Sequence, residues 1–165
     1  MELSTHVDID APPERVWDVL TDFEHYHEWN PFARVAGRPT RNARLHVELT
    51  PPGGRAMRFR PTVTHVEADH ELRWLGHLWR PGVFDGEHRF VLEPLDDGTR
   101  TAVTHAEVFT GALVPLVWRL VGPGTERGFE AMNAALKRRV EDGVERAEET
   151  EAGVPTTRGG SHRTA

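Results

Sequence analysis

Hydrophobic and polar residues alternate at the start of the chain and then change to a helical spacing. One face of residues 2–9 carries Leu3, Thr5, Val7 and Ile9. The other face is polar, which predicts a half-buried strand because neighbouring side chains of a strand point to opposite sides. The apolar residues that follow have helical spacing; they are Val16, Val19, Leu20 and Phe23. A second short helix is predicted for residues 25–29, because the residue before Pro31 is pushed out of the helical conformation.

Between residues 31 and 110 the alternating pattern returns in about six runs, which predicts about six strands. Clusters of turn-forming residues separate them, at 37–42, 51–54, 68–70, 81–82 and 96–98. Turns this short indicate antiparallel hairpins. The run at 57–63 is interpreted as one strand, with Met57, Phe59 and Val63 on its dry face and Arg58 and Arg60 on its wet face.

A long helical pattern follows Gly111. Its apolar stripe consists of Phe129, Met132, Leu136, Val140 and Val144. The segment Gly122-Pro123-Gly124 interrupts the pattern, which predicts a kink or a break. Residues 150–165 show no periodicity and few large apolar residues, so we expect a disordered tail after one domain at residues 1–149.

The order of elements is one strand, two short helices, six strands and one long helix, which predicts an α+β fold. An antiparallel sheet of about seven strands cannot bury its apolar face alone. The C-terminal helix is the only predicted element of matching length, so we expect the curved sheet to wrap around it and to leave a cavity between them.

Composition limits the class of protein. The chain has 165 residues, no cysteine and a net charge of −6, which favours one domain and excludes disulfides and thiolate ligands. The acidic balance argues against nucleic-acid binding. No apolar run reaches the roughly 18 residues of a membrane span, and the N-terminus lacks the features of a signal peptide. We therefore expect no integral membrane association and a cytoplasmic location. Charge is uneven, with seven arginines and one acid, Glu48, between residues 34 and 60.

Polar residues occupy the predicted inner face of the last hairpin. His105 and Glu107 alternate with Val103 and Phe109, and His88 occupies the same kind of position on the preceding strand. A buried carboxylate needs a partner, so we expect Glu107 to pair with a histidine or an arginine, or to have a raised pKa. Three roles remain open: these residues satisfy each other structurally, orient a ligand, or act as catalytic acid–base groups.

Large apolar residues complete the expected ligand site; they are Phe59, Trp74, Phe90, Phe109, Phe129 and Met132. A metal site is not expected, since His25 and His27 are two residues apart and do not share a helix face. The sequence also has no glycine-rich phosphate loop and no GxSxG or HExxH pattern.

Four segments carry a family resemblance: IDAPPERVWDVLTDFEHYHEWNP, LRWLG, FDGEHRFVLEPLDDGTRTAVTHAEVFTG and GFEAMNAALKRRVE. Over residues 1–147 the chain resembles the START-like helix-grip superfamily, in its SRPBCC branch near the polyketide cyclase/dehydrase group. The resemblance implies a helix-grip fold and leaves the activity open, because the superfamily includes lipid carriers, hormone receptors and cyclases. Enzymes of this kind need no metal and no organic cofactor, so none is expected.

Two functions of different class follow. The first is binding of a hydrophobic, aromatic or polycyclic small molecule whose polar groups meet His88, His105 and Glu107. The second is a cyclase or dehydratase in which one of these side chains moves a proton next to a carbonyl. A third, weaker interpretation is a module that binds a partner through the arginine-rich outer face of the sheet.

Overall fold

The computed structural model describes residues 1–50, 54–78 and 80–152. The elements follow in the order β1 (Glu2–Ile9), α1 (Pro13–Thr21), a 3₁₀ turn (Phe23–His25), α2 (Tyr26–Trp29), β2 (Ala33–Ala36), β3 (His46–Leu49), β4 (Met57–Phe59), β5 (Thr62–Glu67), β6 (Glu71–Leu78), β7 (Phe84–Leu95), a second 3₁₀ turn (Asp96–Gly98), β8 (Arg100–Thr110) and α3 (Val114–Ala152). The predicted α+β class, with two short helices after the first strand and one long helix at the end, is confirmed.

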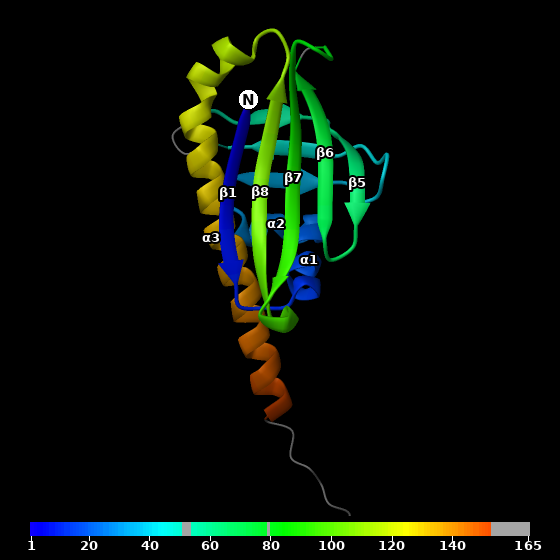
Figure 1. Ribbon diagram of the computed structural model, residues 1–165, viewed down its shortest axis with the longest axis vertical. Coiled ribbons are helices and arrows are strands. Elements are labelled where there is room, and N and C mark those ends of the chain that lie inside the picture. The colour runs from blue at the N-terminus through cyan, green and yellow to red at the C-terminus, as the bar shows by residue number, and fades with distance from the viewer. Residues whose placement is uncertain (51–53, 79, 153–165) are drawn as a thin grey trace, which may run out of the picture.

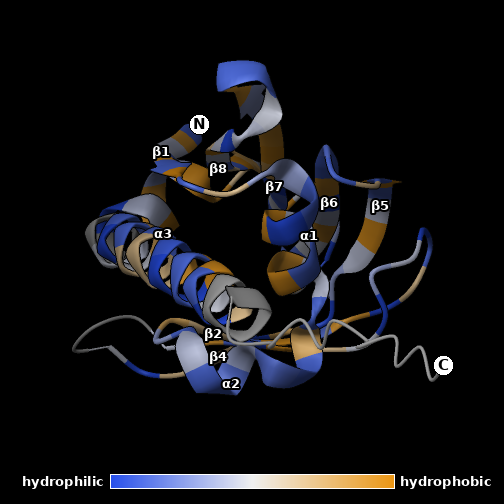
Figure 2. Ribbon diagram, turned by 90° about the horizontal axis from the view of Figure 1, so that it is seen from below, coloured by the Kyte–Doolittle hydropathy of each residue, from blue (hydrophilic) through white to orange (hydrophobic). Residues whose placement is uncertain are grey.

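The strands form two antiparallel sheets. Five of them pair in the order β1-β8-β7-β6-β5, and the other three in the order β2-β3-β4. In Figure 1 the three-stranded sheet lies behind the five-stranded sheet, and its strands run across the other strands. Figure 2 shows the two sheets on opposite sides of the molecule, with α3 along one side. The single sheet of about seven strands that the sequence predicted is thus eight described strands in two sheets.

Pro61 marks the point at which the chain leaves one sheet for the other. The run at 57–63 was predicted as one strand, and the structure divides it into β4 and β5. Proline has no N–H to donate to a ladder. The Pro61 carbonyl instead accepts a hydrogen bond from the Leu45 N–H at 2.8 Å. The change of sheet brings the two apolar faces opposite each other.

Helix α3 packs its apolar stripe into the interior. Phe129, Met132, Leu136 and Val140 are buried, as the periodicity predicted. A kink or a break was predicted at Gly122-Pro123-Gly124; the helix does not break there, since α3 is continuous from Val114 to Ala152. A proline inside a helix removes one backbone hydrogen bond and can bend the helix without ending it. In Figure 1 the helix changes direction in its upper, yellow part.

Helix α1 contributes Val16 and Leu20 to the core, and both are fully buried. The sequence predicted a tail from residue 150, and its residues 153–165 lie outside the described part of the chain. Among the helices of the described part of the chain, none combines the length and the apolar content that crossing a membrane requires.

Candidate functional site

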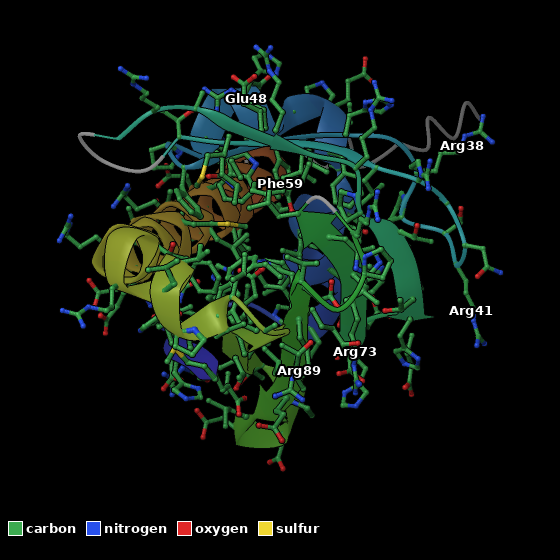
Figure 3. All side chains as sticks on the ribbon, turned by 90° about the horizontal axis from the view of Figure 1, so that it is seen from above. Arg38, Arg41, Glu48, Phe59, Arg73 and Arg89 are labelled. Carbon is green, nitrogen blue, oxygen red and sulfur yellow. The ribbon has the colours of Figure 1, made fainter. Side chains whose placement is uncertain are left out.

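A cavity of about 140 Å³ lies between the two sheets and α3. Its wall is mainly apolar and aromatic, with Phe32, Phe59, Trp74, Phe84, Phe109 and Met132 among the lining residues. In Figure 3 Phe59 points from the three-stranded sheet into the interior, whereas Arg73 and Arg89 lie on the outer side of the five-stranded sheet. One water needs about 10–15 Å³ on this scale, so the space exceeds that of a solvent site.

The structure brings most of the predicted site residues to this cavity. Phe59, Trp74, His88, Glu107, Phe109 and Met132 line it. His105, Phe90 and Phe129 lie behind that wall, and each is fully buried. Of the three polar residues predicted to share one wall, His88 and Glu107 therefore line the cavity. His105 does not line it and instead contacts His88.

The His88 ring lies between the cavity and the core. It stacks on Trp74, its cross-strand neighbour on β6, with 4.7 Å between ring centroids and 4° between planes. On its other side β8 places Glu107 opposite His88. The Nδ1 atom of His88 is 3.6 Å from Oε2 of Glu107, and the two side chains are only 9% and 15% exposed. The polar end of the cavity is thus a histidine–carboxylate pair.

His105 is held by aromatic stacking and two hydrogen bonds. Its ring lies between Phe90, at 4.4 Å, and Phe129, at 3.7 Å. Its Nδ1 is 2.9 Å from the Oδ1 of Asn133, and its Nε2 is 2.9 Å from the Nε2 of His88. Burial, together with neighbouring His88, holds the pKa of His105 well below its usual range, although the bond to Asn133 opposes this. His105 is therefore neutral at neutral pH.

Two polar residues that the sequence analysis did not select complete this group. Asn133 on α3 donates from Nδ2 to the Thr5 hydroxyl at 2.9 Å. Thr5 on β1 donates in turn to the His105 carbonyl at 3.3 Å. A signal for both was present, because each is a polar residue at a position that the periodicity assigns to an apolar face.

Gly86 makes room for the carboxylate. It is the cross-strand partner of Phe109, and a Cβ atom built on it would overlap the Glu107 Oε1 atom. A glycine inside a strand often marks such a close approach. The Glu107 side chain therefore lies flat against β7, with Oε2 toward His88.

Tyr26 also lines the cavity, and sequence reasoning did not find it. Its hydroxyl donates to the Leu20 carbonyl at 2.5 Å, away from the carboxylate. Burial raises the pKa of the phenol, so Tyr26 is neutral. At the rim, His77 pairs with Asp85 at 2.7 Å. The Tyr26 hydroxyl is thus bonded within the core, and the His77 ring is paired at the rim.

The seven arginines between residues 34 and 60 are all exposed. Arg58 pairs with Glu48 at 2.5 Å on the outer face of the three-stranded sheet.

The two histidines considered for a metal site do not form one. His25 bonds to Asp22 at 2.7 Å, and within the described ranges no group of three or more acidic, histidine or cysteine side chains could hold a metal ion.

Comparisons with known proteins agree with this architecture. Residues 1–141 match the family described as polyketide cyclase / dehydrase and lipid transport. Among curated proteins no match was found. Among solved structures, the Zhui aromatase/cyclase from Streptomyces sp. R1128 is similar at a TM-score of 0.72 and 16% identity, over 89% of this chain and 97% of that one.

Two further structures have the same fold. The protein TTHA0849 from Thermus thermophilus is similar at a TM-score of 0.67 and 20% identity, over 87% of this chain and 99% of that one. A START superfamily protein from Mycobacterium smegmatis is similar at 0.63 and 22%, over 86% and 97%. Likeness at these identities establishes the START-like fold. The ligand must be argued from the cavity itself.

Proposed function

Because the chain belongs to the polyketide cyclase/dehydrase and lipid transport family, we propose that it binds a hydrophobic, aromatic or polycyclic small molecule in the cavity between the sheets and α3. One observation carries this proposal: the inner wall of an apolar and aromatic space holds a histidine–carboxylate pair, His88 and Glu107. Ligand sites have this character, with a mainly apolar wall and a few placed polar groups that fix orientation.

The wall gives different interactions to the two ends of such a ligand. Rings of the ligand pack against Trp74, Phe84 and Phe109, which supply dispersion and edge-to-face contacts. A hydroxyl at the other end donates to the Glu107 carboxylate. Losing a hydrogen bond to a charged group costs about 1.5–3 kcal/mol. The carboxylate therefore selects among apolar ligands of similar shape.

The test uses two probes that differ by one hydroxyl, 2-naphthol and naphthalene. We expect both to bind, with 2-naphthol tighter, as measured by calorimetry or by quenching of tryptophan fluorescence. The variant Glu107→Gln keeps the size of the side chain and removes its charge. It should weaken 2-naphthol by about tenfold, equivalent to about 1.4 kcal/mol, and leave naphthalene unchanged.

Glu87→Gln is the matched control, because Glu87 lies on the same hairpin and does not line the cavity. It removes the same charge and should change neither affinity. Binding of neither probe, together with no co-purified small molecule in native mass spectrometry, would contradict the proposal.

A second function is favoured by the same pair. In a cyclase or dehydratase, the His88–Glu107 pair would remove an acidic proton next to a carbonyl and return it to a leaving hydroxyl. The test is incubation with a poly-β-keto thioester mimic. A cyclase converts it, and Glu107→Gln abolishes the rate, whereas a carrier releases it unchanged.

A further inference from the structure

One line of side chains joins the first strand to the cavity. It runs from Thr5 through Asn133, His105 and His88 to Glu107, and the first three contacts, counted from Thr5, are hydrogen bonds of 2.9 Å. Each contact constrains the next, because each hydrogen bond needs one donor and one acceptor. The positions of the protons along this line can therefore be followed from its outer end.

The Thr5 hydroxyl fixes the orientation of the Asn133 amide. Its neighbour at 3.3 Å is the His105 carbonyl oxygen, which can only accept, so the hydroxyl donates to it. The hydroxyl is then left to accept from Asn133, and the group that faces it must be the NH₂. The amide oxygen consequently faces His105.

The amide oxygen in turn fixes the tautomer of His105. An oxygen that only accepts requires the proton to be on Nδ1 of His105. Since buried His105 is neutral, its Nε2 carries no proton and accepts. The group 2.9 Å away is Nε2 of His88, which must donate. His88 therefore carries a proton on the nitrogen that faces the core.

This leaves Nδ1 of His88 facing Oε2 of Glu107 at 3.6 Å. A neutral His88 would present a lone pair to a carboxylate, which places two acceptors opposite each other in a largely buried site. One additional proton resolves the conflict. We propose that Thr5 and Asn133 are positioning residues that keep the His88 proton on Nε2, so that His88 and Glu107 share one exchangeable proton at the cavity wall.

Without the Thr5–Asn133 constraint another arrangement becomes possible. The Asn133 amide could turn, His105 could carry its proton on Nε2, and His88 could carry its proton on Nδ1. A neutral His88 would then donate to the Glu107 carboxylate with no additional proton. Loss of the constraint should therefore move the His88 proton from Nε2 to Nδ1.

The shared proton also defines the class of ligand, and this consequence rests on the proposed function. With the proton between Nδ1 and Oε2, the Glu107 Oε1 atom beside Gly86 remains an acceptor. Such a wall favours a ligand hydroxyl, either a phenol or an enol, over a ketone, an ether or a carboxylate on the same ring frame. We expect 2-naphthol to bind at least about tenfold tighter than 2-methoxynaphthalene.

The proton positions can be measured in the ligand-free protein by NMR of ¹⁵N-labelled histidine, because protonated and bare ring nitrogens have different ¹⁵N shifts. We expect His105 with its proton on Nδ1, and His88 with a proton on Nε2 and an Nδ1 shift between those of a protonated and a bare nitrogen. A proton on Nε2 of wild-type His105 would overturn the proposal.

Two variants of Thr5 separate positioning from packing. Thr5→Val keeps the shape and removes the hydroxyl, and the proton of His88 should move from Nε2 to Nδ1, seen as a change in both ¹⁵N shifts of the ring. Thr5→Ser keeps the hydroxyl and should retain the wild-type shifts. Asn133→Leu removes the acceptor of the Nδ1 proton and should act like Thr5→Val. Unchanged ¹⁵N shifts of His88 in folded Thr5→Val would refute the role of Thr5.

The two proposals can fail independently. If the tautomers are as expected and no naphthalene derivative binds, the proposed function fails and the proton placement stands. If 2-naphthol binds through Glu107 and His105 is the Nε2 tautomer, the binding site stands and the role of Thr5 and Asn133 is wrong.

Discussion

The Glu107 carboxylate lies where a side chain at position 86 would be, because a Cβ atom on Gly86 would overlap Oε1. The absence of that side chain, as much as the contact with His88, determines the orientation of the carboxylate. Gly86→Ala should therefore turn the Glu107 side chain away without removing its charge. The moving group is the end of a flexible side chain, so we expect little loss of stability and about a fivefold weaker affinity for 2-naphthol, measured by calorimetry.

Gly76 provides the control for this variant. It is the cross-strand partner of Gly86 and lines the same cavity, and its added Cβ would meet only the Pro61 side chain at 3.5 Å, an ordinary contact distance. Gly76→Ala thus adds the same methyl group without touching the carboxylate. Equal losses of 2-naphthol affinity in both variants would mean that Gly86 matters for cavity volume alone.

The lowered pKa of His105 should make stability depend on pH. In the unfolded chain a histidine titrates near pH 6.5, so the unfolded state binds one more proton than the folded state below that value. This contribution to stability is complete above about pH 7 and is lost as the pH falls. Urea unfolding at pH 7.5 and 5.5 should differ by about 1.4 kcal/mol from this group. His105→Gln should remove that difference. If the variant shows the same difference in unfolding free energy between the two pH values as the wild type, His105 is not its cause.

Tyr26 offers a test that separates stability from binding. Its hydroxyl donates to the buried Leu20 carbonyl, so Tyr26→Phe leaves that oxygen without its partner. We expect a loss of about 1–2 kcal/mol in the free energy of unfolding, measured with urea. Since the hydroxyl is directed to Leu20, affinity for naphthalene and for 2-naphthol should not change. A selective loss of 2-naphthol affinity would instead make Tyr26 a ligand contact.

The sequence predicted the elements better than the division into sheets. Met57, Phe59, Pro61 and Val63 alternate without interruption, although the chain changes sheet at Pro61. The alternation survives because both sheets face one interior, so apolar side chains on either side of the corner are buried in the same space. The periodicity predicts which face of a strand is buried, but it does not predict which strand pairs with it. The same reasoning placed His88 and Glu107 on the inner face.

The line of hydrogen bonds could not be predicted from spacing, because it depends on how α3 lies over β8. Asn133 and His105 are 28 positions apart, and their contact needs the height and rotation of the helix. The sequence did show one feature that the residues of this line share. Thr5, His105 and Asn133 are all polar residues in apolar series, and polar groups at buried positions must find partners. Considered together, they predict a buried polar cluster without its connectivity.

Two glycines of α3 test how closely the helix must approach the cavity wall. Gly128 is buried, and a Cβ atom there would overlap the ring of Phe32, which lines the cavity and packs on Phe129 at 6.0 Å. Gly128→Ala must displace a buried aromatic ring, so we expect a loss of about 1–3 kcal/mol of stability, despite the better helix propensity of alanine. At Gly143 a Cβ would meet no atom within 4 Å. Gly143→Ala should therefore gain about 0.5–1 kcal/mol from propensity alone, measured by urea unfolding. If Gly128→Ala is stabilised as much as Gly143→Ala, the contact between α3 and Phe32 does not limit the position of the helix.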